Sequence, residues 1–132
     1  MILLLDTHSF LWAAMAPEKL SAKARKAVAD PGNEVNLSTI SFWEISLKFA
    51  LGKLELVGCT PDDLVKVAAD MGLAIAAPTP EESAGFHRLP RQAHKDPFDR
   101  MLIWQCLQRR WTFVTRDGAL DEYAALGLKT LW

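Results

Sequence analysis

A short apolar run near the start of the chain ends abruptly in an acid. Ile2 to Leu5 are all apolar, and Asp6 follows directly. A continuous run of this length is typical of a strand that is buried on both faces, as in a parallel sheet. Asp6 would then lie at the carboxyl end of the strand, which is the edge where open α/β sheets bind ligands. The alternative is that Asp6 only caps the helix that follows.

The rest of the chain repeats this change from strand to helix. Because helices separate the predicted strands, the sheet should be mostly parallel, with right-handed crossovers and helices on both faces. We therefore expect one domain over residues 1–132, with a three-layer α/β/α fold and a mostly parallel central sheet of about five strands. The later strands are predicted at 34–37, 73–76, 111–115 and 128–131, and the helices at 9–15, 21–29, 38–51, 60–71, 79–88, 96–109 and 119–126.

Three further acids are expected at the same edge of the sheet. Asp117 follows the strand predicted at 111–115, just as Asp6 follows the first predicted strand. Glu44 and Asp99 fall in the first turns of predicted helices, on apolar stripes that should face the core. A carboxylate is costly there unless something pairs with it. For Glu44 a local explanation is open, because Ser41 lies three residues before it and the two could form a capping box.

Four acids at one edge would need a cation, because clustered carboxylates repel one another. Connectivity alone does not require that the four side chains meet. If they do, a set of oxygen ligands suits Mg²⁺ or Mn²⁺. The natural chemistry of such a site is metal-assisted phosphodiester hydrolysis, in which the ion activates water and stabilises the phosphate in the transition state.

Basic residues cluster around Asp96 and Asp99. Residues 87–116 contain seven arginines and lysines against these two acids, although the whole chain has a net charge of −1. This asymmetry favours a polyanionic substrate beside the metal. Asp96 itself, followed by proline, is predicted to cap a helix. Arg109 and Arg110 are expected only to complement the end of that helix. The candidate substrate-binding residues are Arg91, Lys95, Arg100 and Arg116, with His94 as a further contact.

The candidate acids lie in four short motifs: Leu4-Leu5-Asp6-Thr7, Ser41-Phe42-Trp43-Glu44-Ile45, Asp96-Pro97-Phe98-Asp99-Arg100 and Val114-Thr115-Arg116-Asp117. In their order and spacing, these motifs resemble those of PIN-domain ribonucleases, and most closely the VapC-like toxins of prokaryotic toxin–antitoxin pairs. The resemblance implies that Asp6, Glu44, Asp99 and Asp117 bind the metal and carry the catalysis. It also implies a Mg²⁺- or Mn²⁺-dependent endoribonuclease, commonly a homodimer, that a small antitoxin protein inactivates by occluding the site.

Two features depart from the family pattern. His8 stands where many members carry Asn or a small polar residue, and Trp104 and Gln105 stand where many carry small residues. Neither removes a proposed ligand, and both bear on the shape of the site. His8 also argues against an aspartyl-phosphate phosphohydrolase, which needs a second Asp at that position. The other alternative is a non-catalytic PIN-like module that binds RNA or protein; loss of acids would indicate it, and none of the four is missing.

Location and partners can also be predicted. The two cysteines, Cys59 and Cys106, form no metal or redox motif and are expected to be buried free thiols in a reducing cytoplasm. No apolar stretch approaches the ~18 residues of a membrane helix, so we expect no membrane association. Leu11 and Trp12, in the helix predicted at 9–15, are expected to form part of a partner surface.

Overall fold

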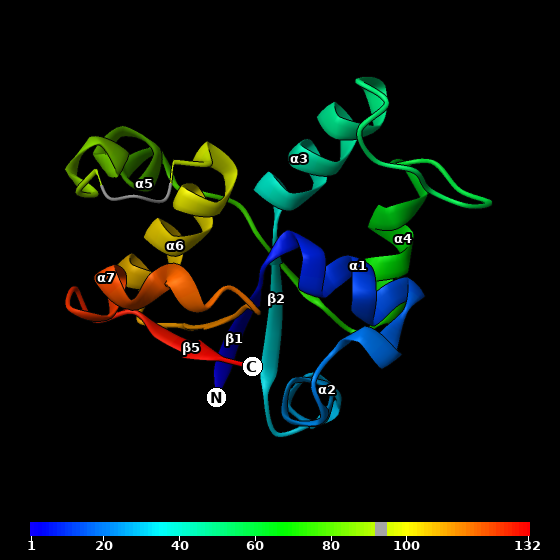
Figure 1. Ribbon diagram of the computed structural model, residues 1–132, viewed down its shortest axis with the longest axis horizontal. Coiled ribbons are helices and arrows are strands. Elements are labelled where there is room, and N and C mark those ends of the chain that lie inside the picture. The colour runs from blue at the N-terminus through cyan, green and yellow to red at the C-terminus, as the bar shows by residue number, and fades with distance from the viewer. Residues whose placement is uncertain (92–94) are drawn as a thin grey trace.

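The computed structural model describes residues 1–91 and 95–132, so the predicted substrate contact His94 lies outside the described residues. Its centre is a sheet of five parallel strands in the order β3-β2-β1-β4-β5 (Figure 1). The prediction of a parallel α/β sheet is confirmed. The strands are β1 (Ile2–Leu5), β2 (Glu34–Ser38), β3 (Ala74–Ala76), β4 (Thr112–Val114) and β5 (Lys129–Leu131).

Strand β1 occupies the middle of the sheet and is buried on both faces. Leu3 and Leu5 pack into one apolar cluster, while Leu4 packs into the other, as the alternation of side chains along a strand requires. Figure 1 shows helices on both sides of the strands, which gives the three predicted layers. One side carries α1 (Thr7–Met15), α2 (Ala22–Ala29) and α4 (Asp63–Asp70), and the other carries α6 (Pro97–Arg109) and α7 (Asp121–Ala124).

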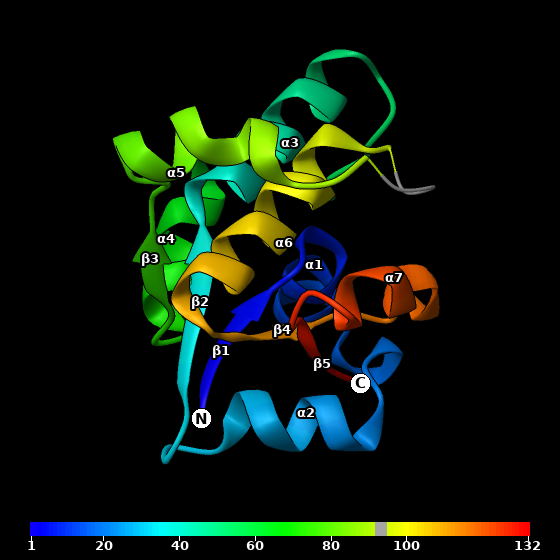
Figure 2. The ribbon, with the colours of Figure 1, turned by 90° about the vertical axis from the view of Figure 1, so that its left-hand side faces the viewer.

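Two helices extend past the carboxyl ends of the strands. Strand β2 leads directly into α3 (Thr39–Ala50), and α5 (Pro80–Gly85) lies near the same end of the molecule, whereas α2 crosses the opposite end (Figure 2). The described residues also form three short 3₁₀ helices: η1 (Pro17–Lys19), η2 (Phe86–Arg88) and η3 (Gly118–Leu120). Among the described helices, none combines the length and apolar character that a membrane crossing requires.

Some predicted boundaries are wrong for local reasons. The helix predicted from residue 60 begins at Asp63, because the Asp63 carboxylate accepts a hydrogen bond from the backbone N–H of Thr60 (2.8 Å) and holds that residue in the preceding turn. The helix predicted at 119–126 divides into η3 and α7. Cys106 is a buried free thiol as expected, but Cys59 is only half-buried.

An ion pair between Glu82 and Arg109 ties α5 to α6. Glu82 completes a capping box with Thr79, and Arg109 donates to both of its carboxylate oxygens (2.7 and 2.8 Å) and to the carbonyl of Ala77 (2.7 Å). Arg109 therefore does more than complement the end of α6. The hydrogen bond from Arg109 is the main reason why the pKa of Glu82 lies below its ordinary value.

Candidate active site

A pocket of about 250 Å³ lies at the carboxyl ends of β1 and β4. Three of the four predicted acids line it, and each comes from a different part of the chain. Asp6 follows β1, Asp99 lies in the first turn of α6, and Asp117 follows β4. The complete lining is Asp6, His8, Asp99, Ile103, Phe113, Thr115, Asp117 and Leu120.

Asp6 is fixed by two hydrogen bonds. Its backbone N–H donates to the carbonyl of Val114 (3.0 Å), which extends the pairing of β1 with β4. Its Oδ1 accepts from the N–H of Ser9 (2.7 Å), so Asp6 is the N-cap of α1. The capping interpretation is therefore confirmed. The cap uses one carboxylate oxygen, and so capping and metal binding are compatible at this residue.

Asp117 lies in a tight turn that its own side chain supports. Its backbone N–H donates to the hydroxyl of the buried Thr115 (3.1 Å), and its Oδ1 accepts from the N–H of Ala119 (2.9 Å). The turn presents Asp117 at the mouth of the pocket, where its side chain is exposed. Thr115 thus positions Asp117 through the backbone while lining the same pocket.

Asp96 is the N-cap of α6, as predicted. Its Oδ1 accepts from the N–H groups of Phe98 (2.9 Å) and Asp99 (3.1 Å), and Pro97 occupies the first helical position. The cap fixes the turn that carries Asp99 into the pocket. Asp96 itself does not line the pocket.

Replacing Asp96 with alanine is expected to lower the free energy of unfolding by about 1 kcal/mol, because two backbone donors at the start of α6 lose their acceptor. Asp96→Asn keeps a side-chain oxygen and should be nearly neutral. Urea unfolding of the two variants measures the difference. Equal losses in both would show that the carboxylate charge matters here rather than the cap.

Glu44 lies apart from the pocket lining. Its side chain is 3% exposed, and both oxygens have partners: Oε1 accepts from the hydroxyl of Thr7 (2.7 Å), and Oε2 accepts from the ammonium of Lys48. Because Thr7 directly follows Asp6, Glu44 is connected to the edge of the pocket through one residue. The structure therefore brings three of the predicted carboxylates to one pocket and leaves the fourth, Glu44, outside the lining of that pocket.

The capping-box interpretation of Glu44 is wrong. Helix α3 begins at Thr39 and its cap is Ser38, whose hydroxyl accepts from the N–H of Ile40 (3.1 Å). Ser41 consequently lies inside the helix, where its hydroxyl is 3.0 Å from that of Thr7. Sequence reasoning missed both partners of Glu44. The spacing of four residues between Glu44 and Lys48 was a usable signal, whereas Thr7 is brought near only by the tertiary fold.

The four predicted substrate-binding cations differ in their surroundings. Arg116 is exposed beside Asp117, with its guanidinium 6.0 Å from the centre of the Trp12 ring. Arg100 is half-buried and donates to the carbonyls of Leu89 (3.0 Å) and Pro90 (3.3 Å), so it also holds the segment before α6. Arg91 and Lys95 are both exposed.

The carboxylates that line the pocket are the kind of ligand that Mg²⁺ or Mn²⁺, the ion implied by the four motifs, would need. The three aspartates offer hard oxygen ligands, which are the ligands Mg²⁺ and Mn²⁺ take in proteins. Within residues 1–91 and 95–132, no three histidine, cysteine, aspartate or glutamate side chains come close enough together to form a ready-made metal site. Mg²⁺ commonly uses only one or two carboxylates and keeps several waters, and a pocket of about 250 Å³ has room for such a hydrated ion. The residues fit the ion in chemistry.

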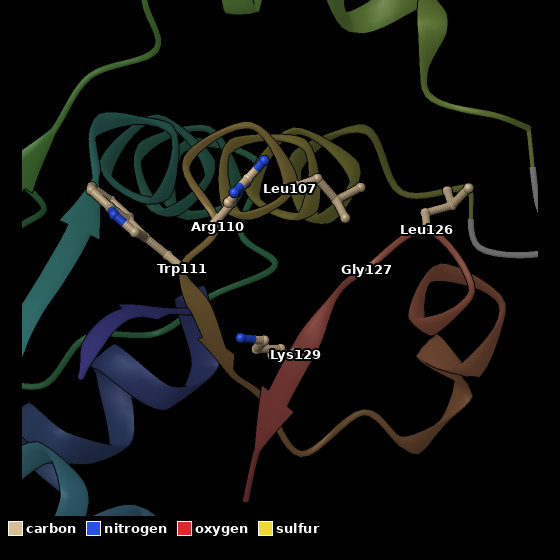
Figure 3. Close-up of a pocket in the computed structure, with 6 residues that line it drawn as sticks. All are labelled: Leu107, Arg110, Trp111, Leu126, Gly127 and Lys129. Atoms are coloured by element: carbon tan, nitrogen blue, oxygen red, sulfur yellow. The ribbon is translucent and has the colours of Figure 1, made fainter.

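Two other pockets lack this chemistry. An apolar groove of about 560 Å³ shares His8 with the aspartate pocket and runs along α1. A second pocket, of about 360 Å³, lies at the amino-terminal ends of β4 and β5, away from the aspartates (Figure 3). Its polar side chains are cations, Arg110 and Lys129, and none of its lining residues is an acid. The aspartate pocket therefore remains the candidate active site.

Several solved structures share this fold. One is VapBC2 from Rickettsia felis, bound to a DNA fragment from its promoter. Its comparison with this chain gives a TM-score of 0.67 at 14% sequence identity, and the alignment covers 99% of this chain and 98% of the VapBC2 chain. For FitAcB from Neisseria gonorrhoeae the TM-score is 0.61 at 18% identity, and the alignment covers 100% of this chain and 97% of the FitAcB chain. For VapBC-5 from Mycobacterium tuberculosis the TM-score is 0.60 at 12% identity, and the alignment covers 98% of this chain and 97% of the VapBC-5 chain.

The family of the chain is identified by comparing its sequence with known proteins. No curated protein matches the chain. The family model for the PIN domain, however, matches residues 3–126, which confirms the resemblance carried by the four motifs. Since the match spans nearly all of the sequence, the chain belongs to the PIN-domain family, a family of nucleases.

Proposed function

We propose that this protein is a divalent-metal-dependent endoribonuclease, acting in the cytoplasm as the toxin of a toxin–antitoxin pair. The observation that supports this most is the meeting of Asp6, Asp99 and Asp117 at one pocket in a PIN-domain chain. Residues 1–132 would act as one domain. The structures with the same fold include toxin–antitoxin complexes, which favours an antitoxin partner for this chain as well.

The proposed site consists of the four predicted acids. Asp6, Asp99 and Asp117 would hold Mg²⁺ or Mn²⁺, with Glu44 beside them. When bound, the ion activates a water and offsets the charge that builds on the scissile phosphate. The cap on Asp6 and the turn at Asp117 fix both carboxylates before any ligand arrives, and such preorganisation lowers the cost of binding.

The basic residues would bind the RNA backbone. Arg116 directly precedes Asp117 in the same turn and is exposed, so it can approach a phosphate held at the pocket. Arg91 and Lys95 are exposed on the chain before α6 and would add charge along the strand of RNA, while Arg100 would mainly position that segment. Such contacts make binding dependent on salt.

Cleavage of a mixed RNA pool by the purified protein tests the proposal. Cleavage should require Mg²⁺ or Mn²⁺, stop with EDTA, and be lost in Asp99→Asn, which also excludes a contaminating nuclease. Metal binding without cleavage by the parent protein, lost in the variant, would indicate a narrow RNA target that the pool lacks.

The alternative is a non-catalytic PIN-like module that binds RNA or protein. It is supported by the lack of a ready-made cluster of three metal ligands among the described residues. The same experiment separates the two, because a binding module would show neither cleavage nor binding of Mg²⁺ or Mn²⁺.

The antitoxin would dock on the apolar groove along α1. Leu11 is buried beneath it and Trp12 is half-buried, so the two are not both sealed in the core, as a partner surface requires. His8 lines both this groove and the aspartate pocket. A peptide in the groove would therefore lie at the edge of the active site.

Replacing Val57 with aspartate is expected to prevent inhibition by the cognate antitoxin. Val57 lines the groove and is 93% exposed, so the substitution should leave folding and RNA cleavage unchanged while placing a charge on the apolar surface. The measurement is RNA cleavage titrated with antitoxin. Val65→Asp, on exposed α4 surface outside the groove, is the matched control. Inhibition equal to that of the parent would exclude the groove.

A homodimer is also proposed. Helix α3 and the residue that caps its end expose apolar side chains four residues apart, Trp43, Leu47 and Leu51, and Trp43 is 61% exposed. A second copy of the chain would cover this side of α3, and sedimentation of the purified protein measures whether it does.

A further inference from the structure

The pocket at the amino-terminal ends of β4 and β5 combines cations with apolar side chains (Figure 3). Its volume of about 360 Å³ is typical of small-molecule sites, which have apolar walls and a few polar groups. The apolar walls here are Leu107, Trp111 and Leu126, and the charged groups are Arg110 and Lys129. The pocket thus has the composition of a site for an anion that carries an apolar part.

The two cations are exposed, and no acid is among the described residues that line the pocket. They come from different elements, since Arg110 ends α6 and Lys129 begins β5. Lys129 is the register partner of Thr112, two residues after Arg110, and Figure 3 shows its side chain extending toward β4. Neither cation forms an ion pair with another described residue. Cations gathered in this way attract an anion.

The backbone conformation of Arg110 makes an arginine unusual at this position. Its φ is 57° and its ψ is 39°, and among the described residues it is the only non-glycine residue with a positive φ. Glycine is the usual residue at such a helix end, because a side chain in the left-handed conformation costs free energy. The helix end does not need this second cation, because Arg109 already lies in the last turn of α6. The arginine therefore indicates a role for its side chain in the pocket.

A nucleoside phosphate matches both parts of the pocket. Arginine donates hydrogen bonds in a planar fork that fits phosphate oxygens, and lysine adds a compact positive charge. A nucleobase is flat and packs against aromatic or apolar side chains. Leu126 is 45% exposed and Leu107 is half-buried, so both offer apolar surface that a base can cover. An inorganic anion would leave this surface in contact with water.

We propose that this pocket binds a nucleoside phosphate, with the phosphate on Arg110 and Lys129 and the base against Leu107 and Leu126. The ligand is a free nucleotide or the 5′-terminal nucleotide of an RNA strand, which share this chemistry. The pocket lies at the opposite end of β4 from the aspartates and holds no acid that would recruit a metal. The inference therefore does not rest on the proposed function.

Titration of the parent protein with AMP in the presence of EDTA, followed by NMR, tests the proposal. The backbone amide signals of Gly127 and Lys129 should shift and saturate, whereas those of Asp6 and Asp117 should not move. Lys129→Gln should weaken AMP binding by at least about ten-fold, because a hydrogen bond to a charged group commonly contributes this much to affinity. Lys53→Gln removes an exposed cation outside the pocket and is the matched control.

Arg110→Gly separates a role in binding from a role in folding. Because glycine suits the left-handed backbone, the variant should unfold at a higher urea concentration than the parent protein. It should nevertheless lose AMP affinity by at least about ten-fold. Leu126→Ala should weaken the binding of AMP and leave the binding of inorganic phosphate unchanged, because it removes only the contact with the base.

A 5′-phosphorylated RNA tetramer distinguishes the two sources of the ligand. It should bind the pocket more tightly than AMP if the site serves RNA, and no more tightly if the site serves free nucleotides. Three results would overturn the proposal: no shifts in the pocket with AMP, parent-like AMP affinity in Arg110→Gly and Lys129→Gln, or equal affinities for AMP and inorganic phosphate. Each of them would leave metal-dependent cleavage at the aspartates standing.

Discussion

Asp6→Asn is expected to reduce metal-dependent RNA cleavage by more than about 100-fold, while the free energy of unfolding changes little. Loss of a residue that only supports a metal ligand typically costs 10- to 100-fold in affinity or activity, so loss of a ligand should cost at least the upper end of this range. Stability should be retained because asparagine caps helices about as well as aspartate, and the Asp6 cap on α1 needs only a side-chain oxygen.

Asp96→Asn is the matched control for this change. Asp96 is also an N-cap aspartate, it lies close to the site, and it does not line the pocket. Cleavage in Asp96→Asn should remain within a few-fold of the parent activity. Initial rates of RNA cleavage at saturating Mg²⁺, together with urea unfolding, measure both variants. If Asp6→Asn cleaves as fast as Asp96→Asn, Asp6 is a cap and nothing more.

Arg109→Met is expected to destabilise the fold by about 3 kcal/mol, the largest stability effect we predict. Removing one partner of a buried ion pair leaves the other charge without compensation, which costs roughly 3–5 kcal/mol. The lower end applies because the Arg109 side chain keeps 21% of its exposure. Urea unfolding at pH 7 measures the loss. Lys66→Met breaks an exposed pair and should cost no more than about 1 kcal/mol; similar losses in the two variants would contradict the prediction.

The same pair predicts a pH dependence. The pKa of Glu82 in the folded protein lies below 4.5, mainly because Arg109 donates to it. A depressed carboxylate pKa gives stability that is fully present above the unfolded value and is lost as the pH falls through the folded value. The difference in unfolding free energy between the parent protein and Arg109→Met should therefore shrink below pH 4.5. A difference that stays constant down to pH 3 would show that the ion pair is not its source.

The sequence predicts those parts of the fold whose causes are local. The apolar run before Asp6 is sufficient for β1, and the Asp96-Pro97 pair is sufficient for the start of α6, because caps and buried strands are determined by neighbouring residues. The start of α3 was harder to place, since Ser38 and Ser41 both offer a capping hydroxyl and only the finished helix shows which is used.

The site could be predicted less completely than the fold. Parallel topology alone brings Asp6 and Asp117 to one edge of the sheet, and the pocket contains both. The surroundings of Glu44 depend on Thr7, which is 37 residues away in the chain, and Arg100 contacts carbonyls 10 and 11 residues before it. Such contacts leave no periodic signal, because the tertiary fold determines them. The roles of these residues in metal and RNA binding remain predictions.

The position of β1 between β2 and β4 affects the order in which the protein forms during synthesis. Its pairing with β2 becomes available early, but its other edge pairs with residues 112–114. Contacts between segments so distant in sequence form slowly and late. A nascent chain that has not yet reached β4 exposes one edge of its central strand and lacks Asp117. The aspartate pocket therefore cannot form on the ribosome until β4 and Asp117 have been translated, which delays any activity of the site until both have left the ribosome.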